Sequence, residues 1–191
     1  MIEFLLWFMM LIEVQRYEQP VKPPRKTIEI QKVVEKRETK IKSINISVIH
    51  DSSVKSYMSY KTITDTTSPQ WKLIHEQEIV RVDERGFLRD EQGRYGVAVG
   101  SGIGGIGDKI DFTLSSGKIL KTIVVDQKAD HHTCENNFIH LQDSSVIEFV
   151  IDTNAGYMQD NIQDNGYVFS GNFNNSEEFK GKIKKIEKMI N

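Results

Sequence analysis

Two carboxylates in apolar surroundings are the residues of this chain best suited to acid–base chemistry. Glu148 lies inside the run Val146-Ile147-Glu148-Phe149-Val150, and Asp126 directly follows the run Ile123-Val124-Val125. Burial of a carboxyl group raises its pKa towards the range of a general acid. Simple alternation offers a second interpretation, in which Glu148 lies on the exposed face of an edge strand.

Further polar residues follow Asp126 and extend the candidate site. Asp130 is a third candidate acid, and His132 could orient or tune an acid–base group. Lys128 lies between these residues and is predicted to contact a substrate. The sequence therefore predicts catalytic roles for Asp126, Glu148 and Asp130, supported by Lys128 and His132.

Aromatic residues give the chain candidate sugar-binding positions. Tyr57 and Tyr60 are predicted to bind a substrate, because aromatic faces stack on sugar rings. The alternative is that these tyrosines pack in the core or at its rim, which is the commoner use of such residues.

Residue types that ligate metals gather between positions 126 and 140. They include Asp126, Asp130, His131, His132, Cys134 and His140. The ligand spacings of known zinc sites are absent from this segment. Adjacent histidines on an extended chain also point to opposite sides, so one site rarely uses both. We expect no metal site and no cofactor.

A glycine-rich segment matches the pattern Gly-x-Gly-x-x-Gly through Gly100, Gly102 and Gly105. In a dinucleotide-binding fold these glycines open a helix whose N-terminus holds the pyrophosphate. Here residues 106–112 read as a turn and then a strand, so we interpret the glycines as a tight crossover instead.

Short apolar or alternating runs joined by turns must position these side chains. Strands are predicted at residues 95–99, 109–114, 119–125 and 145–152, with a hairpin turn at Ser115-Ser116-Gly117-Lys118. This pattern indicates a small β-barrel with acids at the ends of strands. Residues 179–190 fit either a lysine-rich helix or another strand. Ser68-Pro69 before Trp71 to Glu78 predicts the start of a helix, with Ser68 as its cap and Pro69 at its first position.

The bulk composition limits the classes of function. The chain has 191 residues, enough for one domain with extensions, and a hydrophobic content of 38%. A net charge of −2 gives no reason to expect a nucleic-acid partner. Cys134 is the only cysteine, so no intramolecular disulfide can form, and the compartment stays open.

The N-terminus is apolar and is followed by a proline-rich segment. Residues 2–12 are nearly all apolar but fall short of the roughly 20 residues that a spanning helix needs. A truncated membrane anchor, a helix on a partner or membrane surface, and an ordinary core helix all fit. Residues 18–26 hold three of the four prolines, which favours an extended spacer between an anchor and a domain.

Several segments together resemble the double-psi β-barrels of bacterial cell-wall proteins, in particular the "3D" domain named for three aspartates. The resemblance covers Val97-Ala98-Val99-Gly100, Gly105-Ile106-Gly107-Asp108, Val124-Val125-Asp126 and Val146-Ile147-Glu148-Phe149. Gly100 stands where that pattern has its first aspartate, and Gln127-Lys128 replaces its Gly-Gly pair. A wider pattern over residues 55–155 is similar to an uncharacterised family of gut Firmicutes and their phages.

This resemblance implies a fold, a compartment and a chemistry. It implies a mainly β protein with a six-stranded double-psi barrel at residues 55–170. An apolar segment (1–17) and a linker or stalk (18–54) precede the barrel, and a lysine-rich tail (171–191) follows it. The implied protein lies at the cell surface or elsewhere outside the cytoplasm, where residues 1–17 offer a membrane anchor, and it acts on peptidoglycan.

In lytic transglycosylases with such a barrel, one aspartate acts as the acid and base, and Asp126 matches its position with Glu148 in support. The alternative function is a non-catalytic module that binds cell walls or builds a phage particle.

Overall fold

The structure is a computed structural model of the chain. It describes residues 39–45, 54–77, 80–134, 136–158, 173 and 176–190. The predicted apolar segment at residues 1–17 lies outside this part of the chain, as does the predicted linker up to residue 38. No helix within the described residues combines the length and the apolar composition that crossing a membrane requires.

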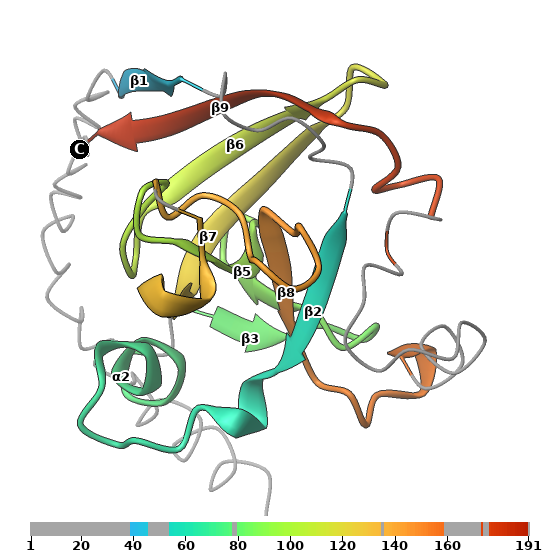
Figure 1. The fold of residues 1–191 in the computed structure, drawn as a ribbon. Coiled ribbons are helices and arrows are strands. Elements are labelled where there is room, and N and C mark those ends of the chain that lie inside the picture. The colour runs from blue at the N-terminus through green and yellow to red at the C-terminus, as the bar shows by residue number, and fades with distance from the viewer. Residues whose placement is uncertain are drawn as a thin grey trace, which may run out of the picture. The chain divides into compact units, whose positions relative to one another are not determined.

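In the described part of the chain, nine strands form one mixed sheet (Figure 1). The main path of the sheet runs β1 (Lys40–Ile44), β9 (Ile183–Ile190), β6 (Lys109–Leu114), β7 (Ile119–Lys128), β5 (Tyr95–Gly100), β4 (Leu88–Asp90) and β3 (Val80–Val82). A branch leaves β5 through β8 (Ile147–Ile151) and ends at β2 (Lys55–Ser59). The sequence prediction of a mainly β protein is confirmed.

The predicted closure into a six-stranded barrel is not confirmed. Within the described residues β1 pairs only with β9, β2 only with β8 and β3 only with β4, so the sheet remains unclosed. Two pairs are parallel, β2 with β8 and β5 with β7, and the other pairs are antiparallel. The sheet also extends beyond the predicted barrel range 55–170, because β1 and β9 lie in lysine-rich segments outside it; β9 matches the strand alternative for residues 179–190.

Residues 183–190, placed by the sequence in a tail, form β9 between β1 and β6. The helix-like spacing of Ile183 and Ile186 has a strand explanation. The register of β9 on β6 shifts between Thr113 and Leu114, so β9 accommodates one additional residue there. Both isoleucines are consequently buried although they lie three positions apart.

The buried side chains form two clusters. The larger cluster is rich in aromatic residues, which meet mostly edge to face; its rings are Tyr57, Phe87, Tyr95, Phe112, Phe149, Phe173 and Phe179. The smaller cluster includes Ala98, Val125 and Val150 and is covered by Leu73 of α2 (Pro69–His75). Strands β5 and β8 therefore contribute to both clusters, which explains their nearly continuous apolar sequences.

Helix α2 begins as the sequence predicts. Ser68 is its N-cap, Pro69 occupies the first helical position, and the Ser68 Oγ accepts a hydrogen bond from the Trp71 N–H at 3.1 Å. A short 3-10 helix, η1 (Tyr60–Thr62), precedes α2, and a second, η2 (Asp130–His132), follows β7. The segment from η1 to α2 borders the candidate site.

A lysine is fully buried in the first residue of β2. The Lys55 Nζ donates a hydrogen bond to the Gly181 carbonyl oxygen at 2.7 Å, which ties β2 to the turn before β9. Burial lowers the pKa of Lys55 from 10.5 to about 8. Between pH 8 and pH 10.5, Lys55 is therefore mostly deprotonated in the folded state but mostly protonated in the unfolded chain.

This burial predicts a pH-dependent contribution to stability. Because the unfolded chain binds more protons between pH 8 and 10.5, the contribution of Lys55 to the free energy of unfolding rises across that interval, by at most about 3 kcal/mol. Urea unfolding of wild type and K55M at several pH values will show a difference that grows with pH. The exposed variant K121M serves as the control and should track wild type; a pH-independent K55M difference would contradict the prediction.

Candidate acid–base site

Asp126 and Glu148 lie in one row across three strands. Ala98 of β5 pairs with Asp126 of the parallel strand β7 on one side and with Glu148 of the antiparallel strand β8 on the other. Residues directly opposite in a sheet project from the same face. The two acids are thus two strands apart, about 10 Å between backbones, with only the methyl group of Ala98 between them.

A β-bulge turns Asp126 towards this row. Val124 belongs to the aromatic cluster, and strict alternation would place Asp126 on the same face. The register of β7 on β5 shifts between Val97 and Ala98, so one additional residue of β7 is accommodated before Asp126. Asp126 then lies on the face of Ala98, where the smaller apolar cluster and α2 are found.

Ser56 extends the row to a fourth strand. It pairs with Glu148 across the parallel strands β2 and β8 and is completely buried. Its Oγ has no hydrogen-bond partner in the described part of the chain. Buried hydroxyl groups nearly always have such a partner, so an unused donor and acceptor beside Glu148 sets this position apart from the core.

The surroundings raise the pKa of both acids. For Asp126 the cause is burial, opposed by hydrogen bonds from the Gln127 backbone and the Gln70 side chain. For Glu148 the main cause is also burial, which the ammonium group of Lys128 opposes. The negative charges of Asp143 and Asp126 raise the pKa of Glu148 further. Both groups are thereby shifted towards the behaviour of a general acid.

Lys128 lies inside the domain and not on a surface where a substrate could meet it. Its Nζ donates to the Ser145 carbonyl oxygen at 2.8 Å and to the Ser145 Oγ at 2.6 Å. Only 6% of the residue is exposed, and burial lowers the pKa of Lys128 to about 8. The predicted substrate contact is therefore corrected: Lys128 acts on the site through its charge, which favours ionised Glu148.

Ser145 connects Lys128 to a second polar group, which consists of His140 and Asp143. The His140 Nδ1 and the Asp143 Oδ1 are 3.1 Å apart, and Asp143 also accepts the Ser145 N–H at 2.9 Å. His132 is exposed on η2, with its ring edge-on to His140 at 6.1 Å between centroids. His132 thus lies near this group but outside the row of acids.

Asp130 does not join the two other predicted acids. It is exposed on η2 and accepts a hydrogen bond from the Ser101 Oγ at 2.7 Å. The chain turns out of β7 after Lys128, which carries Asp130 towards the glycine-rich loop. The structure therefore brings together Asp126 and Glu148 and leaves Asp130 aside.

The two tyrosines differ in exposure. Tyr57 is 1% exposed and meets Phe173 edge to face at 5.8 Å, so its ring belongs to the core and is not open to a sugar. Tyr60 is half-buried at the start of η1, with the Lys61 Nζ 5.6 Å from its ring centroid. The predicted substrate contact is thus corrected for Tyr57, whereas Tyr60 stays available.

Asp126 is reached through a cleft of about 370 Å³. The cleft is lined by Met58, Thr62, Ile63, Thr64, Asp65, Ser68, Gln70 and Asp126. All residues but Asp126 come from the end of β2, from η1, from the loop that follows η1 and from the start of α2, so the cap at Ser68 helps to shape the cleft. Glu148 is not part of this lining, so the two acids differ in their access from the cleft.

Sequence reasoning missed Ala98, Ser56 and Gln70. Their roles come from register and from the placement of α2, neither of which leaves a local sequence signal. Within the described residues, no group of three or more histidines, cysteines or acids could hold a metal ion. Comparisons with protein-family models, with curated proteins and with solved structures give no match for this chain.

The coupling between Lys128 and Glu148 can be tested directly. In K128M the ammonium group is lost, so the pKa of Glu148 should rise above its wild-type value. Carboxyl carbon NMR titration will detect this change as a Glu148 transition at higher pH. K121M, on the exposed side of the same strand, is the matched control; an unchanged Glu148 transition in K128M would refute the coupling.

Proposed function

We propose that the protein belongs to the cell envelope and cleaves peptidoglycan glycan strands as a lytic transglycosylase does, with Asp126 as the acid and base. The observation that carries this proposal is the placement of the Asp126 carboxyl group. It lines a cleft and has a pKa raised by burial, which is the combination that general acid catalysis needs. Neutral hydrogen-bonding groups, Thr62, Thr64, Ser68 and Gln70, line the cleft together with the Asp65 carboxylate, and hydroxyl and amide groups of this kind suit a sugar substrate.

In the proposed reaction protonated Asp126 gives its proton to the glycosidic oxygen as the bond from that oxygen to the anomeric carbon breaks. The resulting carboxylate then takes the proton of a hydroxyl group on the same sugar, whose oxygen bonds to the anomeric carbon. The product is an intramolecular anhydro sugar, and Asp126 ends protonated as it began. An acid–base group of this kind contributes about a hundred- to ten-thousand-fold in rate.

The spacing of the acids favours one acid–base group over a pair. Retaining hydrolysis uses carboxyl groups roughly 5 Å apart, whereas Asp126 and Glu148 stand on strands about 10 Å apart. Inverting hydrolysis tolerates such a separation, but both acids must then flank the bond being broken. Because Asp126 lines the cleft and Glu148 does not, Glu148 is assigned a supporting electrostatic role.

The topology also supports a relationship to double-psi barrels. Two parallel pairs, β2 with β8 and β5 with β7, lie next to each other through the pairing of β5 with β8. We also propose that the protein is related to double-psi barrels. It would lie outside the cytoplasm and be anchored through residues 1–17.

A non-catalytic module that binds cell walls or builds a phage particle is the second candidate. The burial of Tyr57 and Lys128 favours it, because two of the predicted substrate contacts then lie inside the domain.

The variant D126N tests the proposal. Clearing of a cell-wall zymogram should fall about a hundredfold or more, because the amide can neither give nor take the proton. The same variant should unfold with a higher free energy than wild type at neutral pH, since folding disfavours the ionised form of Asp126. Loss of activity together with gain of stability would separate catalysis from misfolding.

The matched control is E91Q, which also neutralises a single acid but at an exposed position. It should clear cell walls like wild type. Clearing by D126N at the wild-type rate would refute the role of Asp126. Sedimentation of wild type with cell walls in the absence of any clearing would favour the non-catalytic module.

A further inference from the structure

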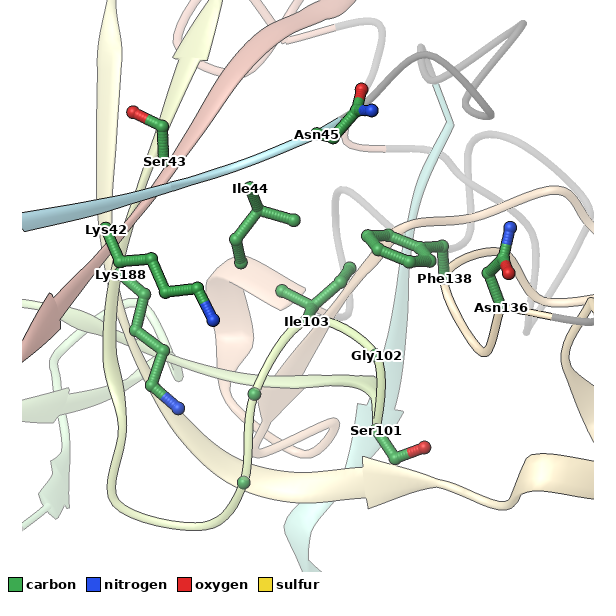
Figure 2. Close-up of a pocket in the computed structure, with 12 residues that line it drawn as sticks. Lys42, Ser43, Ile44, Asn45, Ser101, Gly102, Ile103, Asn136, Phe138 and Lys188 are labelled. Atoms are coloured by element: carbon green, nitrogen blue, oxygen red, sulfur yellow. The ribbon is translucent and has the colours of Figure 1, made fainter.

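A second cavity, of about 500 Å³, lies between β1, β9 and the glycine-rich loop, away from the acid row (Figure 2). Its lining combines two lysines, an apolar wall and several small polar groups. These residues are Lys42, Ser43, Ile44, Asn45, Ser101, Gly102, Ile103, Gly104, Gly105, Asn136, Phe138 and Lys188. None of the described residues in this lining is acidic.

The two lysines occupy positions that the fold assigns to the inner face of the sheet. Lys42 of β1 pairs with Lys188 of β9, and Lys188 pairs on its other side with the buried Ile110 of β6. The neighbouring row on the same face is apolar, with Ile44, Ile186 and Phe112 in register. Inward-facing lysines interrupt that apolar face just where the cavity begins.

The lysine pair is unfavourable unless something compensates its charge. Like charges directly opposite each other in a sheet destabilise the pairing. The Lys188 Nζ has a compensating partner in the Asp108 carboxylate. Lys42 forms no such ion pair with any described acid, and its Nζ extends towards the same space as that of Lys188 (Figure 2). Among the described residues, the cavity therefore has one lysine whose positive charge is not compensated by an acid.

The glycine-rich loop shapes the cavity without binding an anion itself. Its N–H groups are occupied: Gly102 donates to the Asn137 carbonyl oxygen, Ile103 to that of Gly100, and Gly105 to the Asp108 carboxylate. A Cβ atom at Gly102 would lie 2.1 Å from the Asn136 carbonyl oxygen, so only glycine lets the two loops pack this closely. The loop thus lacks the free N–H groups of a phosphate cradle.

The remaining walls indicate what the anion is attached to. Ile103 and Phe138 form an apolar surface opposite Lys42, as Figure 2 shows, and Ser101 and Asn136 border it with small polar groups. Aromatic and apolar faces beside hydrogen-bonding groups are typical of sites that bind sugar rings. A single uncompensated lysine matches the single charge of a carboxylate.

We propose that this cavity binds a sugar that carries a carboxylate, with Lys42 and Lys188 holding the carboxylate and Phe138 contacting the ring. The inference deepens the proposed function and rests on it for the kind of polymer. Alternate sugars of a peptidoglycan strand carry a lactyl group, and its carboxylate is free wherever the stem peptide has been removed. The cavity would then recognise the acidic sugar of the strand, at a position separate from the acid row.

Two sugars that differ in the carboxylate provide the test. N-acetylmuramic acid and N-acetylglucosamine are titrated into the ¹⁵N-labelled full chain, and amide shifts of residues 101–105 report binding. N-acetylmuramic acid should bind and N-acetylglucosamine should bind at least tenfold more weakly. In K42M the affinity for N-acetylmuramic acid should fall about ten- to a hundredfold, and added salt should weaken binding to wild type.

K40M is the matched control, because Lys40 is an exposed lysine two residues earlier on β1 that does not line the cavity. It should bind N-acetylmuramic acid like wild type. Equal binding of both sugars, no binding at all, or full affinity in K42M would overturn the inference. Inorganic phosphate binding more tightly than N-acetylmuramic acid would replace the carboxylate by a phosphate and also overturn it.

Zymogram clearing by wild type and sugar binding, measured together, separate this inference from the proposed function. If wild type clears a zymogram while neither sugar binds, the cavity assignment alone fails. If N-acetylmuramic acid binds through Lys42 while wild type clears nothing, the cavity assignment holds and the proposed catalysis fails.

Discussion

The position of β5 is the constraint on which the candidate site depends. This strand is buried along its whole length and pairs with β7 on one side and with β8 and β4 on the other. Ala98 lies between the two acids in the row, and its small side chain is buried in the smaller apolar cluster under α2. A larger residue at this position would have to fit into that packed cluster, so the row combines a central strand with a small residue.

Burying the two carboxyl groups of this row is unfavourable, and several polar neighbours in the domain offset it. Asp126 has the Gln70 side chain and Glu148 has the charge of Lys128. Lys128 in turn is held by Ser145, whose N–H is bound by Asp143. Such a chain of polar contacts is stable only when its members are satisfied together, which makes the buried and unpartnered Ser56 hydroxyl group conspicuous beside it.

Local sequence patterns predicted the elements better than their arrangement. Apolar alternation located β5 to β8, and the Ser68-Pro69 pair located the start of α2, because caps and periodicity act over a few residues. The pairing of Asp126 and Glu148 with Ala98 depends on a bulge and on two register choices between distant strands, which leave no local trace. The sequence suggested a surface position for Lys128 because nothing in Asp126-Gln127-Lys128 indicates that the end of β7 is buried in the domain.

The pairing of β1 with β9 joins the first and last described strands, and this separation along the chain has a consequence for folding. Bringing such distant segments together costs more chain entropy than forming a hairpin, so this pair is expected to assemble late. An opening confined to β1 would leave β5, β7 and β8 intact while separating Lys42 from Lys188. Hydrogen exchange of β1 can therefore be faster than that of β5, β7 and β8 within one molecule. Binding of an anion between Lys42 and Lys188 would then depend on a local opening of β1 that leaves Asp126 and Glu148 in place.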